Sequence, residues 1–526
     1  MKTLLADVLL YDGLGNPPYS ADLLLEDDRI RQIVRHGTVV FPGVKQENFS
    51  GCSVSPGWID AHGHSDASLF AAPEAFGKIS QGITTEIAGN CGLSAFPVTD
   101  GKVREHLRIL YARYGLNPDW TDFRGYADAL DLRRPAINLA CLCGHNTLRA
   151  AVLGYDRKTP APEELAAMCG LLKKCLEQGT AGFSTGLLYV PGCFSAEAEL
   201  LALLETTAHS GRPYATHLRN EGDRLEEALE EAIRLSRLSG AALQVSHLKT
   251  ALPRNWHKLD SVLERINRAR AAGQRIHADR YPYTYSQTSL SIVLESPFDV
   301  MTDRAIRDAL QEEDTFRKAQ EMLSVSGRDW SRVILSCSNA PSAEGLCGHS
   351  VKEAAELRGC TPAELTVKIL REDAPGTMAA FGGMSEENLK RILAQDWVCC
   401  GTDETARPQD VSLGTSHPRG FGSFPRFIAE LRTQGLPMER IIPRLTALPA
   451  QIFRLRNRGA IVPGAMADLV VFDEEKLSSA ADFQHPHTLA SGIVRVYVAG
   501  HSAYDGMTGT VSSPGYGRVL RHPDFL

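Results

Sequence analysis

The chain of 526 residues is longer than one compact core requires, so we expect one large domain and one smaller domain. Apolar residues make up 43% and charged residues 23% of the chain, which is ordinary for a globular enzyme. The formal net charge of -7 and the lack of a long Lys/Arg run argue against a nucleic-acid partner. No apolar stretch reaches the roughly 20 residues needed to span a bilayer, so no membrane partner is expected.

Both ends of the chain show the alternation typical of strands. Asp7 interrupts the apolar run at the start, and no small-residue cleavage site follows it, so a strand is predicted there rather than a signal peptide. Alternation also occurs in residues 467–500. We therefore predict a small β-sandwich domain built from both termini, residues 1–54 and 455–526, with a larger domain of residues 55–454 between them.

The middle of the chain alternates short apolar runs with helical patterns. The runs are apolar throughout, as strands buried on both faces should be. They cover residues 54–59, 83–88, 136–143, 181–185, 213–216, 242–246, 275–278 and 397–401. This alternation predicts an α/β fold, a closed (β/α)8 TIM barrel, with an open doubly wound sheet as the alternative.

Amphipathic stretches between these runs predict the outer helices. They cover residues 162–178, 195–210, 224–239, 255–272, 385–395 and 438–448. A segment at about 285–350 is longer than an ordinary barrel loop, and loops of that length are usually functional. We expect this segment to form a lid-like insertion.

The chain has 12 cysteines and no CxxC pair. Cys141 and Cys143 lie together in one apolar run, so most of the cysteines are predicted to be small buried hydrophobic residues. A reducing compartment fits this usage best, and we expect a cytoplasmic location.

Side chains that can bind a metal follow several of the predicted strands. His62 and His64 come after the first run, and residues two apart in an extended chain face the same side. The others are Cys91 after the second run, His217 after the fifth, His247 after the sixth and Asp403 after the eighth. Because the carboxyl ends of barrel strands form the catalytic face, these side chains should converge there. Nitrogen, sulfur and oxygen ligands of this kind predict a zinc site.

Distinctive motifs lie along nearly the whole chain. They are PGWIDAHGH at residues 56–64, GITTE at 82–86, GNCG at 89–92, STGLLYVPG at 184–192, THLRNEGD at 216–223, VSHLK at 245–249, YPY at 281–283, HPR at 417–419 and GAMADLV at 464–470. The first resembles the first metal motif of the amidohydrolase superfamily, and the others resemble motifs specific to its D-aminoacylase (N-acyl-D-amino-acid deacylase) family. The resemblance implies zinc-dependent hydrolysis of N-acyl-D-amino acids to a carboxylate and a free D-amino acid.

The resemblance also implies a role for each predicted ligand. Cys91, His217 and His247 would hold one zinc ion tightly. His62, His64 and Asp403 would line a second, weaker position. Many relatives in the superfamily carry a carboxylated lysine on the fourth strand, where this chain has GFST at residues 182–185. The absence of that lysine argues against a hydantoinase or dihydroorotase.

The family's contacts with the substrate carboxylate would fall on Lys249 and Tyr281, with Tyr189 lining the pocket. Family members usually carry a further serine contact a few residues after the YPY motif. This chain has Gln287 there, followed by Thr288 and then Ser289, which is the remaining serine candidate. The difference bears on the preferred side chain of the substrate more than on the reaction.

Asp403 is the predicted proton shuttle, with Glu404 as its nearest rival. Amide hydrolysis needs a group that takes a proton from water and delivers it to the departing nitrogen, and a carboxylate beside the metal can do both. Two other functions stay open: a cyclic-amide hydrolase, and a non-catalytic binding subunit on the same scaffold. The presence of every candidate ligand argues against the second. The N-acyl amino acid is the expected small-molecule partner, and whether the chain forms a homo-oligomer is left open.

Overall fold

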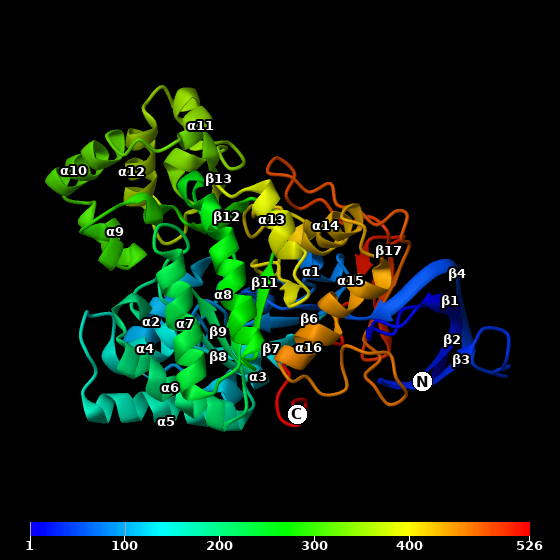
Figure 1. Ribbon diagram of the computed structural model, residues 1–526. Helices are drawn as coiled ribbons and strands as arrows, with labels where there is room; N and C mark the ends of the chain where they lie inside the picture. The colour runs from blue at the N-terminus through cyan, green and yellow to red at the C-terminus, as the bar shows by residue number, and fades with distance from the viewer. Residues whose placement is uncertain (1, 100) are drawn as a thin grey trace.

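The computed structural model describes residues 2–99 and 101–526, and its centre is a barrel of eight parallel strands (Figure 1). The strands follow one another in the order β15-β11-β10-β9-β8-β7-β6-β5. They are β5 (Trp58–Asp60), β6 (Ile83–Ala88), β7 (Asn138–Gly144), β8 (Gly182–Gly186), β9 (Tyr214–His217), β10 (Leu243–Val245), β11 (Ile276–Arg280) and β15 (Val398–Cys400). Each lies in or beside one predicted run, so the predicted barrel is confirmed.

Hydrogen bonds just beyond β5 and β15 close the barrel. The backbone N–H of Ala61 donates to the carbonyl of Cys400 at 3.2 Å, and that of Asp403 donates to the carbonyl of His62 at 2.7 Å. A parallel bridge between Gly63 and Glu404 continues the pairing. The closure therefore joins two segments that carry predicted metal ligands.

Helices cover the outside of the barrel. They are α1 (Phe76–Ile79), α2 (Gly101–Leu110), α3 (Phe123–Asp131), α4 (His145–Leu153), α5 (Pro162–Gln178), α6 (Glu197–His209), α7 (Leu225–Ser239), α8 (Leu259–Ala271), α13 (Glu386–Leu393), α14 (Arg419–Thr433), α15 (Met438–Leu445) and α16 (Ala447–Ile452). In α7 the buried residues Leu225, Leu229 and Ile233 recur every four positions, which gives the helix one apolar face toward the strands. The helix ends at Gly240, whose φ of 78° is the left-handed conformation that glycine adopts without strain.

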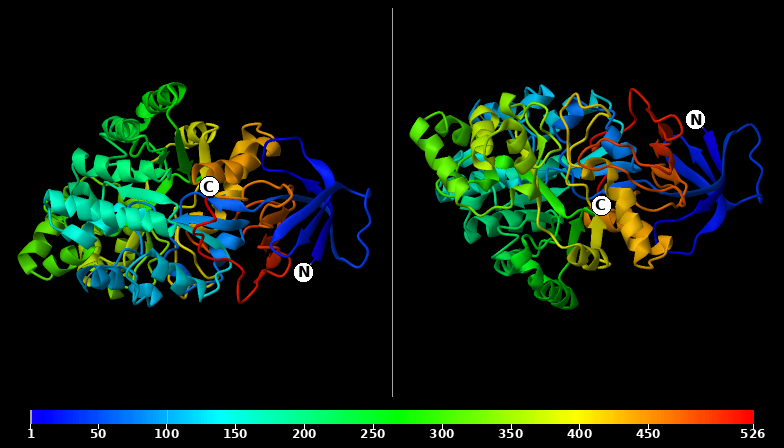
Figure 2. Two further views of the ribbon diagram at one scale, coloured as in Figure 1. Left: turned by 90° about the horizontal axis from the view of Figure 1, so that it is seen from below. Right: turned by 90° about the horizontal axis from the view of Figure 1, so that it is seen from above.

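Strands from both termini form a second sheet of eight strands, as the sequence predicts (Figure 2). They are β1 (Lys2–Leu10), β2 (Tyr19–Glu26), β3 (Arg29–Arg35), β4 (Lys45–Pro56), β16 (Leu469–Phe472), β17 (Ile493–Val498), β18 (His501–Asp505) and β19 (Thr510–Val511). The amino-terminal and carboxyl-terminal strands meet where β4 pairs with β16. Two further hydrogen bonds bring parts of the sheet that are not neighbours in the strand order together. The backbone N–H of Ala467, before β16, donates to the carbonyl of Asp28 between β2 and β3, and that of Gly500 donates to the carbonyl of Ala467.

The first predicted barrel run, residues 54–59, spans two sheets. Its residues up to Pro56 belong to β4, and the barrel strand begins at Trp58. Gly57 lies between them, and a Cβ atom there would lie 2.1 Å from Oγ1 of Thr84. Only glycine lets the chain pass so close to β6, so the change of sheet occurs at this residue.

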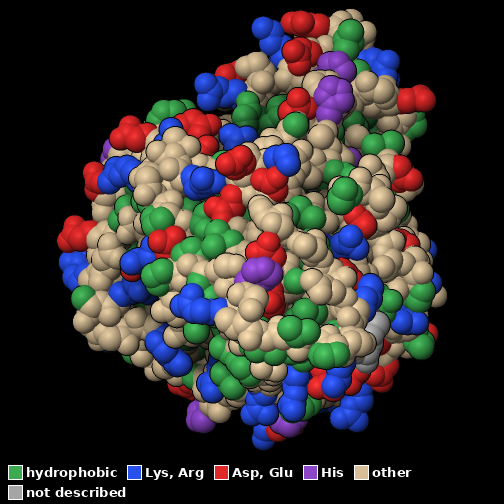
Figure 3. Space-filling model, turned by 90° about the vertical axis from the view of Figure 1, so that its right-hand side faces the viewer, with side chains coloured by type: hydrophobic (Ala, Val, Ile, Leu, Met, Phe, Trp, Pro, Cys, Tyr) green, Lys and Arg blue, Asp and Glu red, His purple; other side chains and the backbone are tan. Residues whose placement is uncertain are grey.

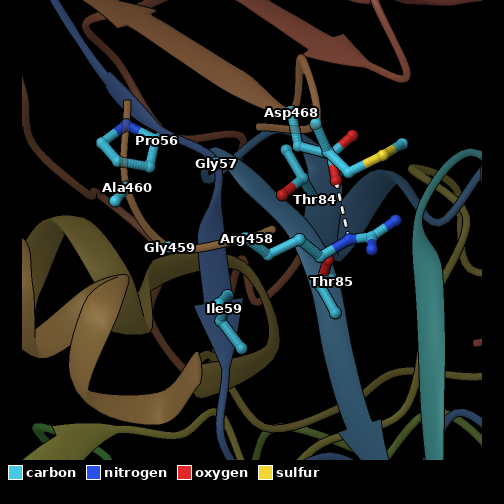
Figure 4. A pocket seen from close by; sticks show the side chains of 10 residues that line it. Pro56, Gly57, Ile59, Thr84, Thr85, Arg458, Gly459, Ala460 and Asp468 are labelled. Atoms are coloured by element: carbon cyan, nitrogen blue, oxygen red, sulfur yellow. Dashed lines mark hydrogen bonds and ion pairs between the residues drawn. The ribbon is translucent and has the colours of Figure 1, made fainter. Parts of the chain in front are cut away.

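A small pocket marks the junction of the terminal sheet with the barrel (Figure 4). The guanidinium of Arg458 is 3.0 Å from the carboxylate of Asp468, which also accepts a hydrogen bond from Asn138. The pocket lies beside the start of β5 and β6, at the opposite end of the barrel from the predicted ligands. Residues at that end of a TIM barrel serve stability rather than chemistry.

Most of the segment between β11 and β15 forms a separate layer with its own apolar core (Figure 1). Its elements are β12 (Tyr285–Ser289), α9 (Asp303–Ala309), α10 (Glu313–Ser324), β13 (Val333–Cys337), α11 (Val351–Arg358), α12 (Pro362–Asp373) and β14 (Met378–Gly382). Strand β14 pairs with both β12 and β13. The layer therefore continues beyond residue 350, the limit suggested by the sequence.

Basic and acidic side chains are interspersed on the face that carries the terminal sheet (Figure 3). Within the described part of the chain, no helix is both long enough and apolar enough to cross a membrane.

Candidate metal centre

The six predicted ligands come together at the carboxyl end of the barrel. They form two groups that share Cys91: His62, His64, Cys91 and Asp403, and Cys91, His217 and His247. Within each group, one ligand atom from every residue lies within 4.8 Å of the others. The Cys91 Sγ atom is 3.4 Å from Nε2 of both His62 and His247. Cys91 therefore lies between two adjoining positions that could each hold a cation.

Three of these residues have a left-handed backbone. The φ angles are 53° at Cys91, 37° at His247 and 52° at Asp403. Such angles are uncommon for residues other than glycine, and they persist only where the surrounding structure holds them. Each residue lies just beyond the end of its strand. The left-handed backbone there helps to set the direction of its side chain.

The buried polar atoms of the cluster fit a metal ion. His217 is 5% exposed, and neither of its ring nitrogens has a hydrogen-bond partner among the residues that the structure describes. Burial raises the pKa of the Cys91 thiol, but His62 and His247 lower it well below its usual value. A thiolate facing imidazole nitrogens and a carboxylate is the kind of donor set that zinc prefers.

Two carboxylates that the sequence analysis did not identify hold the imidazole rings. Glu221 Oε1 is 3.0 Å from Nδ1 of His247, and Asp279 Oδ1 is 3.1 Å from Nδ1 of His62. A carboxylate behind a histidine fixes the ring and leaves the other nitrogen free for a metal. Position offered a signal for both: Glu221 is four residues after His217, and strand alternation places Asp279 on the same side as Tyr281.

Asp403 is held between an imidazole and a guanidinium. Its Oδ1 is 3.1 Å from Nε2 of His64, and its Oδ2 accepts a hydrogen bond from Nη1 of Arg419 at 2.7 Å. Burial raises the pKa of this carboxyl, but Arg419 and His247 lower it well below its usual value, so the group is ionised. Glu404, its predicted rival, accepts a hydrogen bond from Gln287 of the insertion at 2.9 Å.

A cation-rich wall adjoins the ligand cluster. Lys249 Nζ donates to Glu221 and lies 2.7 Å from Nδ1 of His247. The Tyr281 hydroxyl is buried, and no described residue pairs with it. The guanidinium groups of Arg280 and Arg419 lie 4.1 and 4.7 Å from the Tyr281 ring centre. Burial raises the pKa of Tyr281, but Lys249 and the two arginines bring it below its usual value.

Strand β12 of the insertion reaches the cluster through Thr288. The Tyr189 ring lies 4.9 Å from that of His217, and the Tyr189 hydroxyl is 3.3 Å from Oγ1 of Thr288. The Ser289 hydroxyl lies 2.9 Å from that of Ser291 and caps the short helical turn that follows. Thr288 thus contacts the predicted pocket residue Tyr189, while Ser289 bonds within the insertion.

Comparison with known proteins shows the family to which this chain belongs. The chain matches the profile of the amidohydrolase family over residues 48–282 and 302–504. It is 34% identical to N-acyl-D-glutamate deacylase of Alcaligenes xylosoxydans xylosoxydans, over 94% of this chain and 91% of that protein. It is 33% identical to D-aminoacylase of the same organism, over 94% and 93% of the two chains. The crystal structure of N-acyl-D-glutamate deacylase from Bordetella bronchiseptica, in complex with zinc and a phosphonate inhibitor, is similar with a TM-score of 0.81, 34% identity and 99% coverage of both chains.

Proposed function

Because this chain belongs to the amidohydrolase family, and within it to the N-acyl-D-amino-acid deacylases, we propose that it is a zinc-dependent hydrolase of N-acyl-D-amino acids. The products are a carboxylate and a free D-amino acid. The observation that carries the proposal is the buried cluster in which Cys91 is shared by two groups of metal-binding side chains. The cation-rich wall beside it offers a place for the substrate's own carboxylate.

In this proposal Cys91, His217 and His247 hold one zinc ion tightly. His62, His64 and Asp403 line a second position next to it. A zinc ion held there would supply Lewis-acid chemistry for the amide carbonyl and would lower the pKa of a water molecule. Glu221 and Asp279 keep the imidazole rings of His247 and His62 directed at the metal.

Asp403 moves the proton that the reaction requires. Its Oδ1 accepts a proton from the attacking water and donates it to the amine nitrogen as the C–N bond breaks. Both transfers need hydrogen-bond distance, which the place of Asp403 among the candidate metal ligands would allow. The bond from Arg419 to the other oxygen keeps the carboxylate in this orientation.

Lys249 and Tyr281 bind the substrate carboxylate, and Tyr189 lines the pocket beside them. A cation and a phenol hydroxyl can both donate to a carboxylate. Thr288, which contacts Tyr189, is then the residue of this stretch nearest the substrate, while Gln287 bonds to Glu404 and Ser289 lies beside Ser291.

Replacement of Lys249 with methionine keeps most of the side-chain stem and removes the charge. We expect kcat/KM to fall about 10- to 100-fold, the range for loss of a hydrogen bond between charged groups, while zinc stays bound. The loss should be smaller for substrates whose carboxylate is amidated. Steady-state kinetics on paired acid and amide substrates, with metal analysis of the same sample, measure this.

Lys258→Met is the matched control for this variant. Lys258 Nζ donates to the carbonyls of Gly222 and Asp223 at the edge of the site. Its loss should therefore leave kcat/KM unchanged on both substrates. If kcat/KM of Lys249→Met falls by the same factor on acid and amide substrates, Lys249 does not bind the carboxylate.

The substrate class is tested with N-acetyl-D-amino acids, their L enantiomers and cyclic amides such as hydantoins. Turnover of the D compounds alone supports the proposal. Turnover of the cyclic amides alone would identify a cyclic-amide hydrolase, and failure on every compound by zinc-loaded protein would favour a binding subunit.

A further inference from the structure

The loop that carries Cys91 has an unusual backbone of its own. Gly89, Cys91 and Gly92 all have left-handed φ angles, of 74°, 53° and 74°. The two glycines adopt such angles without strain, but a left-handed Cys91 is not a conformation that the chain favours by itself. Bonds from outside the loop must hold it, and the position of the Cys91 Sγ atom depends on those bonds.

One serine hydroxyl on strand β8 joins the two ends of this loop. Ser184 is completely buried, and its Oγ donates a hydrogen bond to the carbonyl of Gly89. The same oxygen accepts a hydrogen bond from the backbone N–H of Gly92 at 3.1 Å. The hydroxyl therefore bonds the residues on both sides of the Asn90–Cys91 pair.

The surroundings leave the loop little room to change. A Cβ atom at Gly186 would lie 2.0 Å from the carbonyl oxygen of Cys91, and one at Gly144 would lie 2.5 Å from that of Gly92. The carbonyl of Gly92 also accepts hydrogen bonds from the backbone N–H groups of Asn146 and Thr147 at the start of α4. The neighbouring glycines allow close packing. The Asn90 side chain bonds to the carbonyls of Ile87 and Gly63, and Ser184 supplies the side-chain bonds to Gly89 and Gly92.

We propose that Ser184 is a positioning residue for the metal centre, and that its hydroxyl holds residues 89–92 so that Cys91 Sγ is directed at His62 and His247 before a metal binds. The inference rests on the proposed zinc centre. Ser184 does not touch the metal position itself. Its effect reaches the metal through the backbone of the loop.

The test compares Ser184→Ala with Ser236→Ala. Ser236 is also buried, and its hydroxyl donates to a backbone carbonyl, that of Ala241, at 2.7 Å on the outside of the barrel. Three quantities are measured: zinc affinity by chelator competition, the sulfur-to-metal charge-transfer band of the cobalt-substituted protein, and hydrogen exchange of residues 87–93 in the metal-free protein. Thermal unfolding of both variants shows whether each is folded.

We expect Ser184→Ala to lower zinc affinity by about 10- to 100-fold, as loss of a residue that supports a ligand typically does. The charge-transfer band should weaken, and the loop should exchange faster in the metal-free protein. Ser236→Ala should change none of the three. A folded Ser184→Ala protein with parental zinc affinity and an unchanged band would overturn the inference. Absence of zinc binding and of the band in the parent protein would instead overturn the proposed metal centre, and this inference with it.

Discussion

Replacement of Asp403 with asparagine is expected to lower kcat by about 10²–10⁴-fold, the usual contribution of a positioned acid–base group. Asparagine has nearly the same shape, and its carbonyl oxygen can still accept the hydrogen bond from Arg419. It cannot take up a proton from water. Because Asp403 does not belong to the group of Cys91, His217 and His247, the tight zinc ion should remain bound.

Glu404→Gln is the matched control for Asp403→Asn. Glu404 is adjacent in sequence and also buried, but its carboxylate accepts hydrogen bonds from Gln287 and Thr405. We expect the kcat of Glu404→Gln to stay within a few-fold of that of the parent protein. The mechanism is assigned to the wrong residue if Asp403→Asn keeps near-parental turnover, or if Glu404→Gln is the variant that abolishes it.

Replacement of Cys91 with alanine has the other large expected effect: loss of both zinc and activity. The Sγ atom belongs to both groups of candidate ligands, and thiolate is the donor that favours zinc over harder cations. Alanine keeps the Cβ atom, so the cost of the left-handed backbone at this position stays about the same. Any loss of zinc or activity in Cys91→Ala can therefore be assigned to the missing sulfur atom. Metal analysis and kinetics on one preparation measure the result.

Cys143→Ala provides the comparison. Cys143 is a fully buried thiol on β7 whose side chain lies in the apolar core that the strands share with the outer helices. We expect some loss of thermal stability from the smaller side chain, with zinc and turnover retained. Full zinc occupancy together with a normal rate in Cys91→Ala would show that the tight site lies elsewhere.

The barrel and the ligand cluster could be predicted because two simple rules act together. Buried parallel strands are apolar along their whole length, so their runs stand out in the sequence. Their carboxyl ends meet at one face, so His62, Cys91, His217 and Asp403 could be placed together although they are far apart in the chain. Neither rule requires knowledge of side-chain contacts.

The remaining features depend on contacts that spacing does not reveal. The boundary between β4 and β5 is set by the close approach of Gly57 to Thr84, which joins distant parts of the chain. The insertion extends to β14 because that strand is the centre of its small sheet. The pattern of one apolar segment does not reveal which strands pair with it. The contact between Glu221 and His247 depends on how a loop folds. The sequence alone therefore did not distinguish Glu221 from an ordinary acidic residue.

The most direct test of zinc-dependent deacylation is to titrate zinc into the metal-free protein. Hydrolysis of the best N-acetyl-D-amino acid and the metal bound per chain are measured on the same samples. The account predicts no turnover without metal and a rise in rate that is complete at close to one zinc per chain, with the L enantiomer left intact. Full activity in metal-free protein, or zinc-dependent cleavage of the L enantiomer alone, would contradict it.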